Sequence, residues 1–329
     1  MTTKLRTPLS ILIALTLALL PSCSRKEESW DIVISNVSVI DGISPTRVNQ
    51  TVKIRDGLII KVMPYIPDQE FNTHSLVDGN GQFLIPGLWD MHVHLMINGH
   101  SDYDYWDKTY PKLFKDVIMP SSAHQLLMAG VTSARDLGGP LDESIAVRDK
   151  INIGEIPGPT MYVSGPFIQK KPYPGTEQFR WGVNGERDAR NKIKTLANAG
   201  VDVIKLIDQD QMTYEELSAI VDEAHINNLK VIAHSHRPEE IRLGLRAGID
   251  NFEHTGLSSA PKYPDDIIEM INERTGQMNI GPLFWTPTIE GLYNYTDIIN
   301  SNEHLDNDSW HLGLPDSIIT DIKKSILKP

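Results

Sequence analysis

Two histidines one residue apart, His92 and His94, are the clearest candidates for chemistry in this sequence of 329 residues. They lie in an apolar, strand-like segment, and side chains at positions i and i+2 of a strand share one face. Asp90, His92 and His94 would therefore point the same way, with the two imidazoles about 6–7 Å apart along the strand. This spacing suits a single metal ion. It also fits two hydrogen-bonded histidines beside a core strand, because short motifs match by chance.

Further side chains that could bind a metal follow downstream, each at the end of an apolar segment. They are Lys205, His234, His236 and His254. Lys205 needs an explanation of its own, because an unpaired ammonium group is costly to bury. It could form an ion pair with a carboxylate such as Asp136 or Glu253. Alternatively, burial lowers its pKa until the neutral amine reacts with carbon dioxide, giving an anionic carbamate that bridges two metal ions.

The elements that must position these side chains change character near residue 84. Residues 30–83 are typical of a small all-β module, with a strand over 31–40 and a hairpin turn at Asp56-Gly57. Downstream, short apolar strands alternate with helical patterns, which predicts βαβ units and a parallel sheet. The predicted strands of this part are residues 88–95, 130–135, 160–164, 201–206, 230–236, 248–254 and 283–287.

This pattern predicts an α/β protein built as a (β/α)₈ TIM-type barrel, preceded by the small β module. In such barrels chemistry collects at the C-terminal ends of the strands, which is where the candidate side chains lie. Helices are expected over residues 188–199 and 213–227, and a Thr213–Glu216 capping box opens the second. Only seven strand–helix steps are visible, whereas a closed barrel needs eight.

The same segments carry a resemblance to a known family. Residues 84–95, 130–139, 231–236 and 248–256, together with Lys205, resemble the amidohydrolase superfamily, and in particular its prolidase and imidazolonepropionase-like branch. The resemblance runs in order from about residue 30 to the C-terminus. It implies a metal-dependent hydrolase that cleaves C–N bonds of amides, dipeptides or cyclic amides, and it likens the small β module to that family's flanking β-sandwich.

The resemblance also implies roles for individual residues. His92 and His94 would bind the more buried of two divalent ions, with zinc the expected metal. Lys205, as the carbamate, would bridge the ions, and His234 and His254 would bind the second. His236 shares a face with His234, and it is expected beside the ligands or facing the substrate. Arg135 could orient substrate, or it could form a structural ion pair.

One residue that the family requires is not visible in the sequence. This residue is an Asp at the end of the eighth strand, which binds metal and moves the proton of the bridging water. Asp321 is the best alternative, but the isoleucines around it recur at helical spacing after Pro315, so we expect a helix there. The eighth strand is therefore expected to be absent, as in a fragment or a truncated product.

Because that Asp is not visible, the activity of this chain stays open at the sequence level. Two alternatives are a catalytically inactive, metal-binding lipoprotein and a mononuclear enzyme similar to imidazolonepropionases or deaminases.

The first residues have the composition of an export signal. Lys4 and Arg6 precede a short apolar segment over residues 11–20, which has the proportions of a signal peptide rather than a membrane span. Cys23, the one cysteine in the sequence, follows a small residue, as in the lipobox of bacterial lipoproteins. An ordinary secretory signal is the alternative. The expected organisation is a signal peptide over residues 1–22, the β module over 23–83 and the barrel over 84–329.

Composition limits the partners. The formal net charge is −12, which argues against binding to nucleic acid or to an anionic membrane surface, since both need a basic surface. We expect a small-molecule substrate and a protein that faces the periplasm or the cell exterior. Contact with a membrane would come only through a lipid on Cys23.

Overall fold

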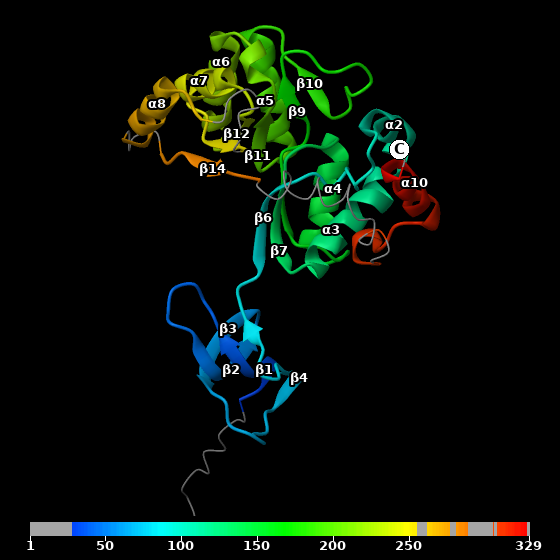
Figure 1. The fold of residues 1–329 in the computed structure, drawn as a ribbon, viewed down its shortest axis with the longest axis vertical. Coiled ribbons are helices and arrows are strands. Elements are labelled where there is room, and N and C mark those ends of the chain that lie inside the picture. Colours follow the sequence, from blue (N-terminus) through cyan, green and yellow to red (C-terminus); the bar gives the residue numbers. More distant parts are fainter. Residues whose placement is uncertain (1–27, 255–261, 277–280, 289–304, 306–307, 328–329) are drawn as a thin grey trace, which may run out of the picture. The chain divides into compact units, whose positions relative to one another are not determined.

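The computed structural model describes residues 28–254, 262–276, 281–288, 305 and 308–327. The chain divides into two compact units, Met1–Pro86 and Gly87–Pro329 (Figure 1). The predicted signal peptide and Cys23 lie outside the described residues. None of the helices described is long and apolar enough to cross a membrane.

The smaller unit is a five-stranded sheet in the order β3-β2-β1-β4, with β5 paired to β1. Its strands are β1 (Trp30–Val39), β2 (Arg47–Arg55), β3 (Leu58–Pro64), β4 (Thr73–Asp78) and β5 (Phe83–Leu84). The predicted hairpin is confirmed: Asp56 and Gly57 join β2 to β3 with φ angles of 53° and 72°, the left-handed values that this turn requires. Among the residues described, this sheet has no second sheet facing it, so the predicted sandwich stays a prediction.

The larger unit is built from parallel strands in two sheets. One sheet has the order β6-β7-β8, and the other has the order β10-β9-β11-β12-β13-β14. The strands are β6 (Leu88–Val93), β7 (Val131–Asp136), β8 (Thr160–Val163), β9 (Phe167–Gln169), β10 (Arg180–Gly182), β11 (Val203–Leu206), β12 (Lys230–His234), β13 (Asn251–Glu253) and β14 (Phe284–Thr286). A strand is thus found within each of the seven predicted segments. The third segment is followed by a separate strand that the sequence did not predict, since β8 pairs with β7 and the following β9 pairs with β11.

Helices follow the strands, as in a TIM-type barrel. Figure 1 shows α5, α6 and α7 beside β11 and β12, while α3 and α4 lie beside β7. The helices are α2 (Tyr103–Thr109), α3 (Met119–Met128), α4 (Leu141–Asn152), α5 (Glu186–Ala199), α6 (Tyr214–Ile226), α7 (Pro238–Ala247), α8 (Asp265–Gly276) and α10 (Asp316–Ile326). Shorter helical turns cover Pro111–Leu113, Phe114–Ile118, Gln209–Gln211 and Asp308–His311.

The local signals for these helices are confirmed. Thr213 and Glu216 form the predicted capping box at the start of α6. Both α5 and α7 end at a left-handed glycine, Gly200 and Gly248, with φ angles of 85° and 88°. Asp321 lies in α10 and accepts a hydrogen bond of 2.8 Å from the hydroxyl of Tyr110, so the expectation that it belongs to a helix is confirmed.

Apolar side chains between the strands and the helices hold the larger unit together. One cluster joins β11–β13 to α5, α6 and α7, and it includes Ile193, Leu217 and Phe252, all fully buried. A second cluster joins β6, β7 and β8 to α3, α4 and α10. Each large apolar side chain buried in this way contributes about 1.5–3 kcal/mol. Packing therefore fixes the strands, and the residues at their C-terminal ends are left to line a cavity.

Candidate metal centre

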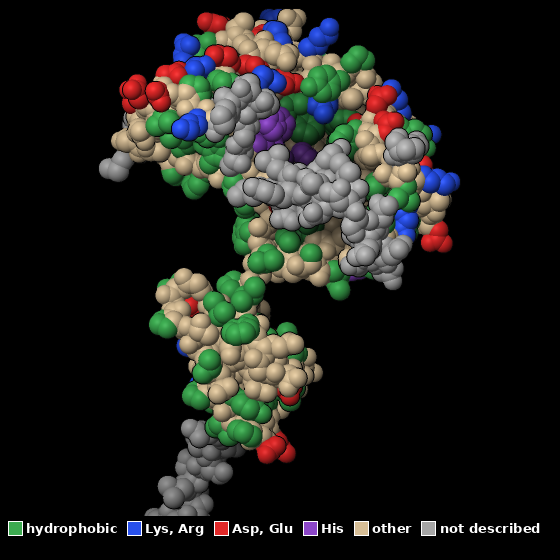
Figure 2. Space-filling view, in the orientation of Figure 1, with side chains coloured by type: hydrophobic (Ala, Val, Ile, Leu, Met, Phe, Trp, Pro, Cys, Tyr) green, Lys and Arg blue, Asp and Glu red, His purple; other side chains and the backbone are tan. Residues whose placement is uncertain are grey.

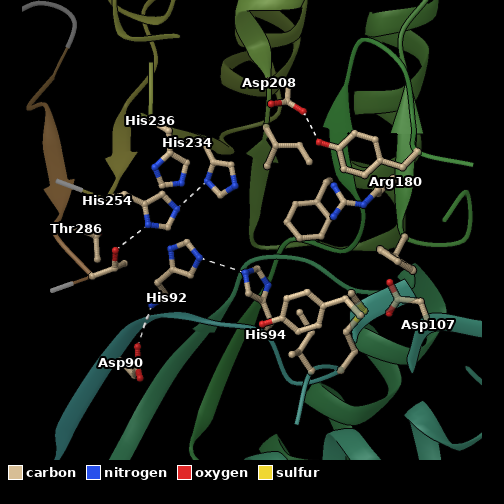
Figure 3. A pocket seen from close by; sticks show the side chains of 18 residues that line it. Asp90, His92, His94, Asp107, Arg180, Asp208, His234, His236, His254 and Thr286 are labelled. Atoms are coloured by element: carbon tan, nitrogen blue, oxygen red, sulfur yellow. Dashed lines mark hydrogen bonds between the residues drawn. The ribbon is translucent and has the colours of Figure 1, made fainter. Parts of the chain in front are cut away.

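Histidine side chains gather in a cavity of about 790 Å³ at the carboxyl ends of the strands. Figure 2 shows histidines inside a hollow of the larger unit, and Figure 3 shows their rings converging. All five histidines named from the sequence line this cavity: His92, His94, His234, His236 and His254. Strands that are distant in sequence therefore bring the predicted residues together.

The first pair of histidines comes from the end of β6. Asp90, His92 and His94 all line the cavity, as the alternation along a strand predicts. The Nε2 atoms of His92 and His94 lie 3.2 Å apart. Two nitrogens bound to one tetrahedral zinc ion at 2.0–2.1 Å would be about 3.3 Å apart. The pair thus has the separation that a shared metal ion requires.

The second pair comes from the ends of β12 and β13. His234 Nδ1 and His254 Nε2 lie 2.9 Å apart, and the other ring nitrogen of His254 is 2.7 Å from the hydroxyl of Thr288. His236 belongs to the same group, since one nitrogen from each of His234, His236 and His254 lies within 4.8 Å of the others. The His254 ring also stacks on His236, with centroids 4.3 Å apart. The choice between His234 and His236 as a ligand therefore remains a prediction.

Lys205 lies at the base of the second pair. Its Nζ is 3.5 Å from Nδ1 of His234, and the side chain is fully buried. Neither Asp136 nor Glu253 forms an ion pair with it among the residues described. Burial lowers the pKa of Lys205 to about 7, although the charge of Glu253 opposes this shift. Burial thus favours the neutral amine, which is the form that reacts with carbon dioxide.

Glu253 has a positioning role in the site that was not predicted from the sequence. It is fully buried on β13, and its Oε2 accepts a hydrogen bond of 2.7 Å from Nδ1 of His92. Its Oε1 accepts from Arg135 at 2.7 Å and from Asn251 at 2.6 Å. Arg135 therefore makes the structural ion pair that the sequence left open. The available signal was the position of Glu253 directly before His254 at the end of a strand.

The contact with Glu253 sets the orientation of His92. An imidazole that donates from Nδ1 to a carboxylate presents the lone pair of Nε2, and metal-binding histidines are usually held in this way. Burial, with the charges of Lys205 and Arg135, lowers the pKa of His92 to about 2. Burial likewise lowers the pKa of His254 to about 2. These rings are therefore neutral at physiological pH, which is the form that binds metals.

Comparison with known proteins identifies the family to which the chain belongs. Residues 83–314 match the Amidohydrolase family, and this match covers more than half of the chain. The chain belongs to the amidohydrolase family. The predicted resemblance is thereby confirmed, and so is a TIM-like α/β fold.

Individual relatives share parts of this amidohydrolase. The chain is 27% identical to the ochratoxinase of Aspergillus niger over 235 residues, which cover 58% of this chain and 46% of the relative. It thus spans about half the length of the curated relatives it matches. A crystal structure of A. niger ochratoxinase matches 92% of this chain and 72% of its own, with a TM-score of 0.62 and 24% identity. A Xaa-Pro dipeptidase with methionine in its active site matches 90% of this chain and 74% of its own, with a TM-score of 0.63 and 20% identity.

The opposite wall of the amidohydrolase cavity contains residues that sequence reasoning missed. They are Tyr103, Asp107, Tyr173, Arg180 and Asp208. These residues lie on α2, on β10 and in loops, and no recognised motif includes them. Figure 3 shows Arg180, Asp107 and Asp208 across the cavity from the histidines.

Replacing Glu253 tests its role in holding the metal centre. In Glu253→Gln the side chain keeps its size but loses the charge that pairs with Arg135 and orients His92. We expect metal affinity to fall about 10- to 100-fold, as is typical when such an outer partner is lost. Competition with a chromophoric chelator measures this affinity. Glu269→Gln, an exposed change on α8, is the matched control, and equal affinities in the two variants would contradict the assignment.

Proposed function

We propose that this amidohydrolase cleaves the C–N bond of an amide, a dipeptide or a cyclic amide with a metal-activated water. The observation that carries the proposal is the two pairs of facing imidazole nitrogens, 3.2 Å and 2.9 Å apart, at the base of one cavity. Family membership supports it, and so do the names of two relatives, an ochratoxinase and a Xaa-Pro dipeptidase.

The donor set favours two divalent ions, with zinc the expected metal. Imidazole nitrogens are typical zinc ligands. We assign His92 and His94 to one ion and His234 and His254 to the other, with Lys205 as a carbamate between them. Two bound ions would supply a water of lowered pKa and would polarise the scissile carbonyl. Glu253 and Arg135 hold His92 in place, and the buried surroundings keep the rings neutral.

Carbamate formation fits the surroundings of Lys205. The neutral amine attacks carbon dioxide, an N–C bond forms, and Nζ releases a proton, which leaves a carbamate anion. The side chain has no carboxylate partner among the residues described, whereas an anion at this place would face two cations. A single-metal enzyme has no need for such a bridge, so Lys205 favours the binuclear site. We assign no described residue to the role of the Asp on an eighth strand.

A hydrolysis assay tests the proposed activity directly. The full chain is loaded with zinc and bicarbonate and then offered proline-containing dipeptides, N-acyl amino acids, cyclic amides and simple amides. We expect turnover of at least one class, its loss after chelation and its recovery when zinc is added. Metal retention without turnover of any compound in the panel would instead support the inactive metal-binding protein.

Replacing Lys205 distinguishes the two-metal site from a one-metal site. In Lys205→Ala we expect the metal content to fall from about two ions per chain to about one, as a two-metal site requires its bridge. Hydrolysis should fall at least about 100-fold, and an added short carboxylic acid should restore part of it by taking the place of the carbamate. Elemental analysis measures the metal content. The control is Lys194→Ala, which replaces an exposed side chain of α5. Full metal content and activity in Lys205→Ala would favour the mononuclear enzyme.

We also propose that the protein is exported and anchored to a membrane by a lipid on Cys23. The supporting features are the basic start, the short apolar segment and the lone cysteine that follows it. In bacterial cells labelled with a fatty acid, the wild-type chain should carry the label and fractionate with membranes. Cys23→Ser should carry none, whereas the neighbouring change Ser24→Ala should be labelled normally. Equal labelling of the wild type and Cys23→Ser would show that Cys23 is not lipidated.

A further inference from the structure

We propose that Arg180 binds a free carboxylate of the substrate, so that the enzyme favours carboxylated amides, such as dipeptides and N-acyl amino acids, over neutral amides and ureas. The inference rests on the proposed hydrolysis for the identity of the substrate. The residue itself is assigned from the opposite wall of the cavity, where Arg180 projects from β10 toward the histidines (Figure 3).

The first argument is that no carboxylate of the described residues forms a direct ion pair with Arg180. Among the described residues that line the cavity, Arg180 is the one arginine, and no lysine lines it. Two arginines close to the site have carboxylate partners: Arg135 binds Glu253 at 2.7 Å, and Arg237 binds Asp208 at 2.8 Å. Within the described part of the chain Arg180 has no such ion pair, and its guanidinium donates one hydrogen bond, to Oε1 of Gln169 at 3.1 Å. A bound carboxylate would supply the missing counter-charge.

The second argument is that Arg180 is held rigidly. Its Cζ lies over the rings of Tyr173, Phe167 and Phe179, at 4.6, 4.8 and 5.6 Å from their centroids. These rings and Gln169 fix the plane of the guanidinium, whose donors match the two oxygens of a carboxylate. Because the side chain is already ordered, little conformational entropy is lost when a ligand binds.

The third argument is the distance from the metal centre. The Phe167 ring that packs on Arg180 also lies against His94, with ring centroids 5.4 Å apart. One aromatic ring therefore separates the guanidinium from a metal-binding histidine. A ligand with a carbonyl at the histidines and a carboxylate a few bonds away would reach both groups.

Neighbouring acids limit what else the wall accepts. Asp208 already accepts hydrogen bonds from Arg237 and from the hydroxyl of Tyr173. Asp107 on α2 makes no hydrogen bond with the described residues and no ion pair with Arg180. Its negative charge therefore opposes part of the positive field of Arg180. One carboxylate close to Arg180 is favoured, whereas a second anion nearer Asp107 is repelled.

The test compares a carboxylated substrate with its own carboxamide on the metal-loaded full chain. We expect the wild type to favour the acid about 10- to 100-fold in kcat/KM, the range of a charge-assisted bidentate contact. In Arg180→Met, which keeps the stem against the rings, this preference should vanish while the rate on the amide changes less than about threefold. Arg180→Lys should keep a reduced preference, because lysine keeps the positive charge but cannot donate two parallel hydrogen bonds to a carboxylate.

Two further variants control the comparison. Asp107→Asn should shift the preference in the opposite direction, raising it a few-fold, because it removes a competing negative charge. Arg187→Met, an exposed change on α5, should leave the ratio unchanged. A purely structural role for Arg180 predicts that Arg180→Met lowers the rates on acid and amide equally. That result, or a wild type that does not discriminate, would overturn the proposal.

Binding measurements separate this proposal from the proposed function. If the wild type hydrolyses nothing, the proposed function fails, but calorimetry with N-acetylphenylalanine and its amide still tests Arg180. Tighter binding of the acid by the wild type, lost in Arg180→Met, would support the carboxylate site even without turnover. Equal binding of acid and amide would overturn it.

Discussion

The metal centre depends on one buried carboxylate, that of Glu253. It lies in β13 of the six-stranded sheet, while its partners Arg135 and His92 lie in β7 and β6 of the three-stranded sheet. A buried carboxylate without partners is strongly unfavourable, so Arg135 and His92 stabilise Glu253 in this position. Glu253 consequently ties the carboxyl ends of the two sheets to each other at the point where the histidines converge.

The same burial acts in one direction on two kinds of basic side chain. It lowers the pKa of the imidazoles, which keeps their lone pairs available to a metal. It also lowers the pKa of Lys205 to about 7, which makes this amine reactive rather than a fixed cation. The environment that makes a metal site is thus also the one in which a lysine can take up carbon dioxide. Both effects follow from placing polar groups at the ends of strands whose other residues are apolar.

The sequence predicted those parts of the structure that local rules determine. Alternation along a strand put Asp90, His92 and His94 on one face, and capping rules fixed the start of α6. The Asp56-Gly57 hairpin and the helical placement of Asp321 follow from equally local patterns. Each of these predictions needs only a few neighbouring residues, which is why it did not require the structure.

The contacts of Glu253 and Arg180 could not be predicted in this way. Glu253 meets Arg135 across 118 positions of sequence, and no pattern within β13 names that partner. Arg180 becomes significant only because three rings surround it and no carboxylate of the described residues forms an ion pair with it. The absence of a partner is a property of the folded cavity. The clustered histidines could therefore be predicted from motifs, whereas the contacts of Glu253 and the position of Arg180 could not.

The two walls of the cavity come from different segments of the chain, and the Phe167 ring contacts both His94 and Arg180. His234 and Glu253 are placed by the pairing of β12 with β13, beside the packed core of the sheet. Arg180 and Asp107 lie on the short strand β10 and on α2, and neither contacts Glu253. Side chains on such peripheral segments can change without loss of the metal centre. If Arg180 binds the substrate as proposed, recognition depends on contacts other than those that position the histidines.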